Sequence, residues 1–462
     1  EITWRDWSSD VCSSDLRDTQ DSTRRLHCPY GFFRRHRSSL YHELFLRTVY
    51  NNTMFIAILG RQPALGATEL ERLYGGDRTR WFSDRAMLIE SDAFDFNRLG
   101  GSLKAGRVIL QANGNWQTIR RAVVDRYAKQ WYGIPHKITL GISVYGFRIS
   151  PRDVQKTGLL LKKQLQQRGV SLRLIPNAEP ALNTATSHHN KLGLSPHKVE
   201  LLIVRNTSGR VIIAESIGAQ NISALAARDQ ARPRTDAFVG MLPPKLARMM
   251  VNFTGLPRKF NDSAAESTSK LCILDPFCGT GTVLQEALLN GYSVIGTDLS
   301  QKMIDYTTEN LSWLRQKFRT TGEVIALQQA DATTFQWKSS RAINAVVCET
   351  YLGQPFSAPP RPEKLREVAG NCNHIITAFL RNIHSQLSNA TPLVLAVPAW
   401  RNRDGHFTHL PLIKHLADLG YQRVLLRHIR PKQLLYYREN QVVAREILIL
   451  TKSPEHRKHT II

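Results

Sequence analysis

The period of hydrophobic and polar positions changes along the chain and separates three blocks. Residues 54–135 and 136–232 mix short apolar runs, typical of strands, with segments in which apolar residues recur every three to four positions, typical of helices. Both blocks are predicted to be small α+β domains. The predicted strands are residues 54–60, 85–91, 107–111, 137–146, 171–176, 197–206 and 209–216, and the predicted helices are 67–75, 118–132 and 152–169.

The third block, residues 233–455, alternates strand and helix patterns. Repeated βα units predict a parallel, doubly wound α/β sheet, and the closing pair of strands predicts an antiparallel strand at its edge. The predicted strands are residues 271–277, 293–300, 323–332, 343–352, 392–400, 434–439 and 444–452, and the helices are 244–253, 282–291, 303–318, 364–387 and 411–420. Residues 456–462 are left as a tail.

Residues 1–53 show no helical or strand period. The stretch DWSSDVCSSDL, residues 6–16, can be back-translated into a sequence that resembles a sequencing-adaptor oligonucleotide. We therefore expect residues 1–16 to be an assembly artefact, residues 17–53 to be upstream translation, and Met54 to be the natural start.

Composition narrows the choice of partners. The formal net charge of +24 favours a polyanionic partner, because phosphate contacts supply much of the affinity for nucleic acid. No run approaches the roughly 18 apolar residues of a membrane helix, so we expect no membrane partner. The four cysteines after Met54 lack CxxC spacing, which argues against a zinc site or a disulfide framework and suits a reducing cytoplasm.

The stretch DPFCGTGTV at 275–283 joins a predicted strand to a predicted helix. Such a glycine turn lets the backbone approach a ligand while helix N-terminal amides face it. Leu284 stands where the dinucleotide-binding fingerprint Gly-x-Gly-x-x-Gly has its third glycine, which argues against a dinucleotide oxidoreductase. Asp298, at the tip of the next strand, can accept both ribose hydroxyls of a nucleoside, and Asp331, after the third, can accept from an adenine amine.

This region resembles the class I S-adenosylmethionine-dependent methyltransferases. The resemblance implies S-adenosyl-L-methionine as the cofactor and three groups of contacts. The methionine end would be shaped by Asp275, Phe277, Gly279, Thr280 and Gly281, the ribose held by Asp298 and Leu299, and the adenine flanked by Asp331 and Ala332. Cys278 is interpreted as a small packing residue of the loop, because no neighbouring base would make it a thiolate.

The fourth strand of this block ends in CETYLGQP. The position resembles the Asp-Pro-Pro-Tyr motif of methyltransferases that modify exocyclic amines of bases, and a related Glu-Pro-Tyr-Leu-Gly pattern. The resemblance implies that Glu349 and the carbonyl of Thr350 accept from the amine and that Tyr351 contacts the base. Thr350 stands where proline is expected, and we expect threonine to loosen the site.

The first two blocks and the connector resemble the THUMP-containing tRNA guanine-N2 methyltransferases, on ISVYG, KTGLLLKKQL, SLRLIPN and ARDQARPRTDAFVGMLPPKLARMMVN. The resemblance implies a ferredoxin-like domain at 54–135, a THUMP RNA-binding domain at 136–232 and a methyltransferase domain at 233–455. It also implies methylation of a guanine near tRNA position ten, with a small activating protein as an open possibility. The candidate RNA-binding residues are Lys156, Lys162, Lys163, Arg168, Arg173 and Lys191.

Three alternatives stay open at this stage. The enzyme could act on ribosomal RNA or on an adenine amine. A catalytically silent RNA-binding protein could retain the fold, as the mismatch at Thr350 allows. A dinucleotide oxidoreductase is the third, although four acidic residues at strand ends favour the methyltransferase.

Overall fold

The computed structural model describes residues 53–236, 241–257, 271–339, 341–439 and 441–453. Every described residue belongs to one unit of the chain, Leu44–Ile462. The expectation that residues 1–53 are not native therefore concerns residues outside the described part, Thr53 excepted.

Eight strands of the described residues form one sheet in the order β2-β3-β1-β4-β8-β7-β5-β6. These strands are β1 Met54–Leu59, β2 Thr79–Ser83, β3 Ala86–Glu90, β4 Ser102–Asn113, β5 Ile138–Tyr145, β6 Leu172–Leu174, β7 Lys198–Arg205 and β8 Arg210–Ala219. β4 and β8 pair antiparallel from Lys104 opposite Ala219 to Asn113 opposite Arg210. The two predicted α+β blocks thus share a continuous sheet.

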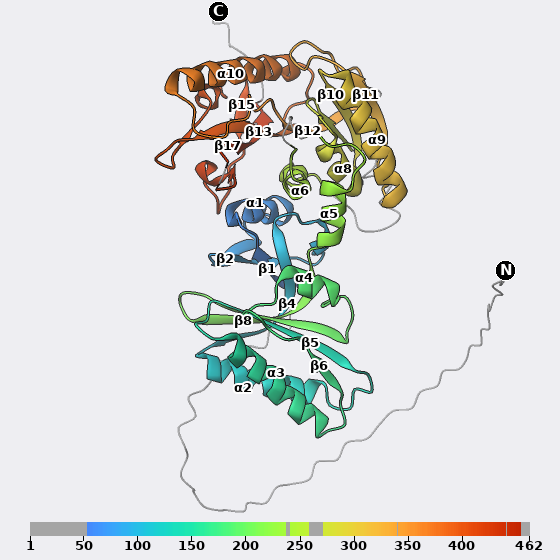
Figure 1. Ribbon diagram of the computed structural model, residues 1–462, viewed down its shortest axis with the longest axis vertical. Helices are drawn as coiled ribbons and strands as arrows, with labels where there is room; N and C mark the ends of the chain where they lie inside the picture. Colours follow the sequence, from blue (N-terminus) through green and yellow to red (C-terminus); the bar gives the residue numbers. More distant parts are fainter. Residues whose placement is uncertain (1–52, 237–240, 258–270, 340, 440, 454–462) are drawn as a thin grey trace, which may run out of the picture. The chain divides into compact units, whose positions relative to one another are not determined.

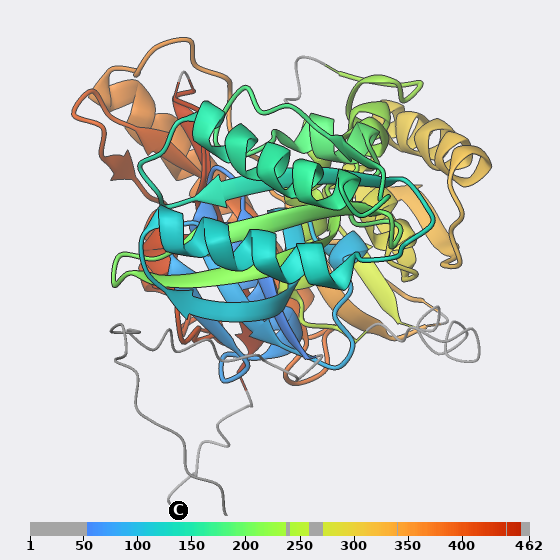
Figure 2. The same ribbon diagram turned by 90° about the horizontal axis from the view of Figure 1, so that it is seen from below.

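Helices cover this sheet, and polar caps fix where three of them begin. The elements are α1 Pro63–Tyr74, η1 Phe96–Arg98, α2 Trp116–Gln130, α3 Pro151–Gln166 and α4 Thr184–His189. The side chains of Asn115, Ser150 and Asn183 accept from the first free amides of α2, α3 and α4, as capping residues do. α2 and α3 lie side by side across one face of the sheet (Figures 1 and 2).

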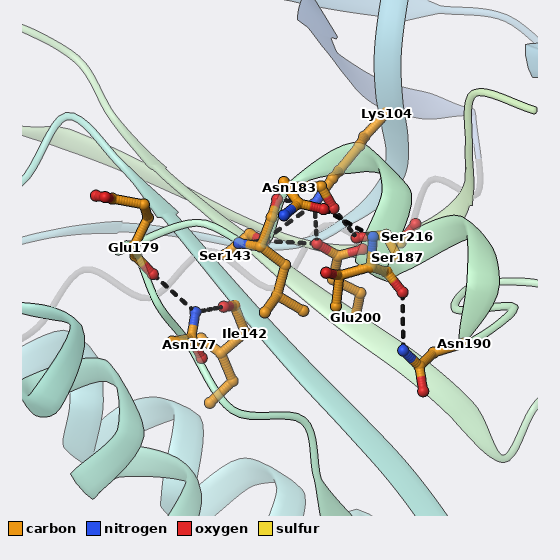
Figure 3. A network of polar contacts seen from close by, with 12 residues as sticks. Lys104, Ile142, Ser143, Asn177, Glu179, Asn183, Ser187, Asn190, Glu200 and Ser216 are labelled. Carbon is orange, nitrogen blue, oxygen red and sulfur yellow. Dashed lines mark hydrogen bonds and ion pairs between the residues drawn. The ribbon is translucent and has the colours of Figure 1, made fainter. Parts of the chain in front are cut away.

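A buried polar network joins the two blocks inside this sheet (Figure 3). Lys104 of β4 reaches across to Ser143 of β5 and to Glu200 of β7, and its ammonium group also donates to the carbonyl of Leu182 at 2.7 Å. The Lys104 and Glu200 side chains are 2% and 0% exposed, so the charges compensate each other without water. Burial lowers the pKa of Lys104, whereas Glu200 raises it.

The connector contributes α5 Ile222–Gln230 and α6 Pro244–Phe253. Pro244 occupies the first turn of α6, where its missing N–H is not needed, so the predicted start of this helix is confirmed. Buried Asn252 of α6 donates to Glu69 of α1 at 2.7 Å and accepts from Arg98 at 2.9 Å. α6 is therefore bonded to the first block through polar groups that are themselves buried.

The second sheet of the described residues runs in the order β11-β10-β9-β12-β13-β17-β15, with β14 on β13 and β16 on β17. Its strands are β9 Cys272–Asp275, β10 Ser293–Asp298, β11 Val324–Gln329, β12 Ile343–Glu349, β13 Pro392–Arg401, β14 Phe407–Thr408, β15 Tyr421–Arg423, β16 Leu435–Tyr436 and β17 Val443–Lys452. The helices are α8 Thr282–Leu289, α9 Gln301–Lys317 and α10 Pro362–His384, with short turns η2 Pro411–Lys414 and η3 Pro431–Gln433. The predicted doubly wound α/β sheet is confirmed.

Two details of this block were predicted wrongly. β17 is antiparallel, as expected, but it lies between β13 and β15, so the edge strand is β15. The predicted helix at 411–420 is a single 3₁₀ turn, Pro411–Lys414, followed by further turns. Its amides bond three residues back, as His415 does to Leu412, and the stretch is bounded by Pro411 and by Gly420, whose left-handed φ of 80° ends it.

The two faces of the second sheet are buried in separate cores. One core combines Ala345 and Val347 of β12 with apolar residues of α6 and α8 and with Leu65 and Leu70 of α1. The other packs the opposite face against α10. Within the described residues, no helix is long and apolar enough to cross a membrane.

Candidate cofactor and substrate pocket

The loop between β9 and α8 is held in shape by backbone bonds and two left-handed glycines. Gly279 has a φ of 51° and Gly281 a φ of 81°, values that residues with a side chain rarely adopt. A Cβ on Gly279 would meet nothing within 4 Å, whereas one on Gly281 would lie 2.9 Å from Thr307 Cγ2. Gly279 thus leaves open space, and Gly281 lets the loop pack against α9.

Asp298 ends β10 and braces this loop. Its Oδ2 accepts from the amide of Gly279 at 2.9 Å, and its Oδ1 accepts from the amide of Ser300 at 2.9 Å. A carboxylate has about four acceptor positions, so capacity for further donors remains on both oxygens. The carboxylate is thereby fixed beside the open space at Gly279.

A pocket of about 1010 Å³ opens at the carboxyl ends of β9, β10, β11 and β12. It is lined by nearly all the predicted site residues: Asp275, Phe277, Cys278, Gly279, Thr280, Asp298, Leu299, Asp331, Ala332, Glu349, Thr350 and Tyr351. Gly281 does not line it and supports the loop from behind. Asp331 is exposed and accepts from the amide and hydroxyl of Thr333, at 2.8 and 2.7 Å.

Buried carboxyl groups give the pocket floor its electrostatics. Asp275 is 1% exposed, and burial raises its pKa well above the usual range, although an amide bond from Phe277 acts in the opposite direction. The neighbouring carboxylates Asp298 and Glu349 raise this pKa further. Burial also raises the pKa of the Cys278 thiol, which agrees with its interpretation as a packing residue.

The end of β12 forms one wall of the pocket. Thr350 is 3% exposed, and both its amide and its hydroxyl donate to the carbonyl of Ala396 on β13, at 3.0 and 3.1 Å. Tyr351 is 43% exposed and lines the pocket. The threonine is therefore hydrogen-bonded twice to the next strand, and the expectation that it loosens the site relative to proline stays a prediction.

Arg445 of β17 is a site residue that the sequence interpretation missed. Its Nε donates to Glu349 Oε1, and the Arg445 and Glu349 side chains are only 9% and 16% exposed. Burial raises the pKa of Glu349, and the Arg445 guanidinium acts against this rise. The available signal was the polar pair Arg445–Glu446 at the start of an otherwise apolar strand.

The connector and α10 supply further pocket residues, of which Met241 and Leu242 lie in GMLPPKLAR, the stretch expected to cover the cofactor pocket, whereas the others were not predicted. Asp236, Met241 and Leu242 come from the connector, and Asn371 and His374 come from α10. Asp236 Oδ2 lies 3.0 Å from the ammonium group of Lys302 on α9. This ion pair links the connector to α9 at the edge of the pocket. These residues lie outside any strand-end motif, so only the fold brings them to the pocket.

The predicted RNA-binding cations lie in the first sheet and its helices. Lys156, Lys162 and Lys163 are on α3, Arg173 is on β6, and Lys191 follows α4 with a left-handed φ of 54°. All of them except the half-buried Lys162 are exposed. Leu174 of β6 packs under Gly158 of α3, so the side chain of the preceding residue, Arg173, points to the other side of this strand. Lys191 comes from a separate element. Their role in RNA binding stays a prediction.

Comparisons with known proteins agree with this geometry. Residues 273–373 match a family model described as a methyltransferase domain. The chain is 32% identical over 205 residues to the tRNA (guanine(10)-N2)-dimethyltransferase of Methanothermobacter thermautotrophicus, covering 44% of this chain and 52% of that relative. The chain thus spans about half the length of this relative. It is 40% identical over 72 residues to the protein of the same name from Pyrococcus abyssi, covering 16% of this chain and 18% of the relative.

Among solved structures, TrmN from Thermus thermophilus is similar with a TM-score of 0.44 and 15% identity, covering 86% of this chain and 99% of that one. The matched domain and the observed strand order identify a class I, Rossmann-like methyltransferase fold with a mixed sheet.

S-adenosylmethionine is the cofactor of this fold, and the pocket fits it. The space at Gly279 lets a ligand approach the backbone, Asp298 offers carboxylate oxygens to ribose hydroxyls, and Asp331 and Ala332 line the wall beyond β11. In the described part of the chain, no group of three or more His, Cys, Asp or Glu side chains is placed to hold a metal ion.

Proposed function

We propose that this chain is an S-adenosylmethionine-dependent tRNA methyltransferase that forms N2-methylguanosine, near position ten of the tRNA. The observation that carries the proposal is the convergence of Asp275, Asp298, Asp331 and Glu349 on one pocket with Tyr351 at its wall. The names of the matched relatives support guanine in tRNA as the substrate.

In this proposal the domains have the boundaries expected from the sequence. A ferredoxin-like domain at 54–135 and a THUMP domain at 136–232 bind the tRNA, and the methyltransferase domain at 233–455 modifies the base. Lys156, Lys162, Lys163, Arg173 and Lys191 contact phosphates. All of these cations except the half-buried Lys162 are exposed, as phosphate contacts require.

When bound, S-adenosylmethionine supplies an electrophilic methyl group on a sulfonium. Glu349 and the carbonyl of Thr350 accept from the guanine amine and turn its lone pair toward that methyl group, while Tyr351 packs on the base. Transfer would form a bond between the guanine nitrogen and the methyl carbon, the cofactor would leave as a neutral thioether, and the amine that Glu349 orients would lose one proton to water. The target guanine flips out of the base stack into the pocket, as in other enzymes that modify a base.

The deciding experiment is transfer of radiolabelled methyl groups from S-adenosylmethionine to unmodified total tRNA by the full chain, followed by nucleoside analysis. N2-methylguanosine is the expected product. N6-methyladenosine, or transfer to ribosomal RNA alone, would replace the substrate in the proposal. Binding of S-adenosylmethionine and tRNA without any transfer would indicate a silent RNA-binding protein or a missing activating partner.

A further inference from the structure

An ion pair beside the pocket spans three neighbouring strands. Glu349 ends β12, Arg445 lies near the start of β17, and β13 runs between them. Glu349 is registered with Ala396 of β13, and Arg445 with Pro398. Both β13 residues are buried and compact, so the long arginine side chain can cross this strand and reach the carboxylate.

Strand alternation puts both partners on the same face of the sheet. Val347 lies two residues before Glu349, and Ile447 lies two residues after Arg445, so each shares the face of its neighbour. Both belong to one buried core, which also contains Ala396 of the intervening strand. The pair therefore lies where that core meets the pocket. A charge at such a place is costly unless it is compensated, and Arg445 supplies the compensation.

Three other titratable groups contribute to the electrostatics around Glu349. Asp275 of β9 and Cys348 of β12 both interact electrostatically with Glu349, and Asp298 of β10 interacts with Asp275. Like charge on Asp275 and Glu349 favours protonation of one of the two. Arg445 is the cation that opposes protonation of Glu349.

We propose that Arg445 is a positioning residue for methyl transfer: it keeps Glu349 anionic and fixes it by Oε1, so that Oε2 is left to accept from the substrate amine. The inference rests on the proposed function. An anionic carboxylate only accepts hydrogen bonds, whereas a protonated one also donates and would compete for the lone pair that attacks the methyl group.

The test is the pH dependence of kcat/KM for methyl transfer to unmodified tRNA, measured with the full chain between about pH 5 and 9. Activity falls as pH falls through the pKa of Glu349, because only the anion orients the amine. An opposite charge in contact with a carboxylate lowers its pKa by about one to three units. R445M should therefore shift the acid limb, which is the fall of kcat/KM at low pH, to a pH higher by roughly one unit or more. At high pH, R445M should regain most of the wild-type rate.

Three further variants make the assignment specific. R445K keeps the charge and should keep the limb close to that of the wild type. E349Q should lower the rate and abolish the limb, leaving R445M without a pH effect in the E349Q background. R423M is the matched control, because Arg423 pairs with Glu446, which points away from Glu349 on β17, and it should leave the limb unchanged.

The outcomes separate this inference from the proposed function. Two results would overturn the role of Arg445 and leave the methyltransferase activity intact. One is a kcat/KM of R445M that is reduced by the same factor at every pH. The other is an acid limb that R445M shifts as much in the E349Q background as in the wild type. Absence of transfer by the wild type would overturn both. If calorimetry shows that R445M no longer binds S-adenosylmethionine, R445Q, which keeps a hydrogen-bond donor, replaces it under the same criteria.

Discussion

Replacing Thr350 by proline separates two views of the pocket wall. The sequence pattern has proline at this position, so T350P would restore the motif if threonine loosened the site. The structure predicts the opposite. The amide and the hydroxyl of Thr350 both donate to the carbonyl of Ala396, at 3.0 and 3.1 Å, and proline removes both donors.

The size of the effect follows from these two bonds. T350V keeps the amide and loses only the hydroxyl bond, worth about 0.5–1.5 kcal/mol. T350P also leaves the Ala396 carbonyl unpaired in a buried strand, which costs about 1–3 kcal/mol more. We therefore expect a loss of about 1 kcal/mol in T350V and about 2–4 kcal/mol in T350P.

Hydrogen exchange followed by mass spectrometry on peptides from β12 and β13 gives the free energy of local opening in each variant, and methyl transfer is measured alongside. T350P should exchange faster than T350V in both strands and transfer methyl groups more slowly, because the Thr350 carbonyl shifts. A T350P protein that protects these strands as well as the wild type, or that is more active, would refute this account and reinstate the loosening hypothesis.

Three further predictions concern other parts of the chain. D298N should weaken S-adenosylmethionine binding about 10- to 100-fold by calorimetry, since charge-assisted bonds worth about 1.5–3 kcal/mol are lost, whereas D305N on the exposed face of α9 should bind normally. G281A should destabilise the second sheet by about 1–2 kcal/mol, since a left-handed residue gains a Cβ that lies 2.9 Å from Thr307 Cγ2; unchanged exchange in α8 would contradict this. K104M should lower the free energy of unfolding in urea by about 3–5 kcal/mol, because it leaves Glu200 charged and buried, and K104M/E200Q should recover part of the loss; equal losses in the two proteins would argue against the pairing.

Local patterns were enough to predict the second sheet and most of its pocket. β9 to β12 run into chemistry-bearing residues at or just after their carboxyl ends, and parallel strands bring these ends together. Asp275, Asp298 and Asp331 could therefore be assigned to one pocket from their strand-end positions, whereas the assignment of Glu349 came from the resemblance to known methyltransferases. The short turn after Pro411 was not predictable in this way, because its apolar spacing also fits a helix.

Residues whose partners lie far along the chain could not be found from the sequence. Arg445 meets Glu349 only because β17 is placed beyond β13, and the same insertion contradicts the predicted edge position. The join of β4 to β8 and the Lys104–Glu200 pair are likewise set by pairing between distant strands. No short window of sequence contains such a contact.

The connector shows how the pocket depends on residues outside the strand ends. Arg232 is 3% exposed and donates to the hydroxyl of Thr282 at 2.6 Å, while Arg228 pairs with Glu286 at 2.6 Å, so both arginines are bonded to α8. α8 begins directly after the glycine loop that carries Gly279, and Thr282 lines the pocket. Arg248 of α6 also pairs with Glu286, at 2.7 Å, so movement of the connector away from α8 would break both ion pairs of this buried carboxylate. The segment that leaves the first sheet is therefore a structural part of the cofactor pocket, and the shape of that pocket depends on the docking of the connector.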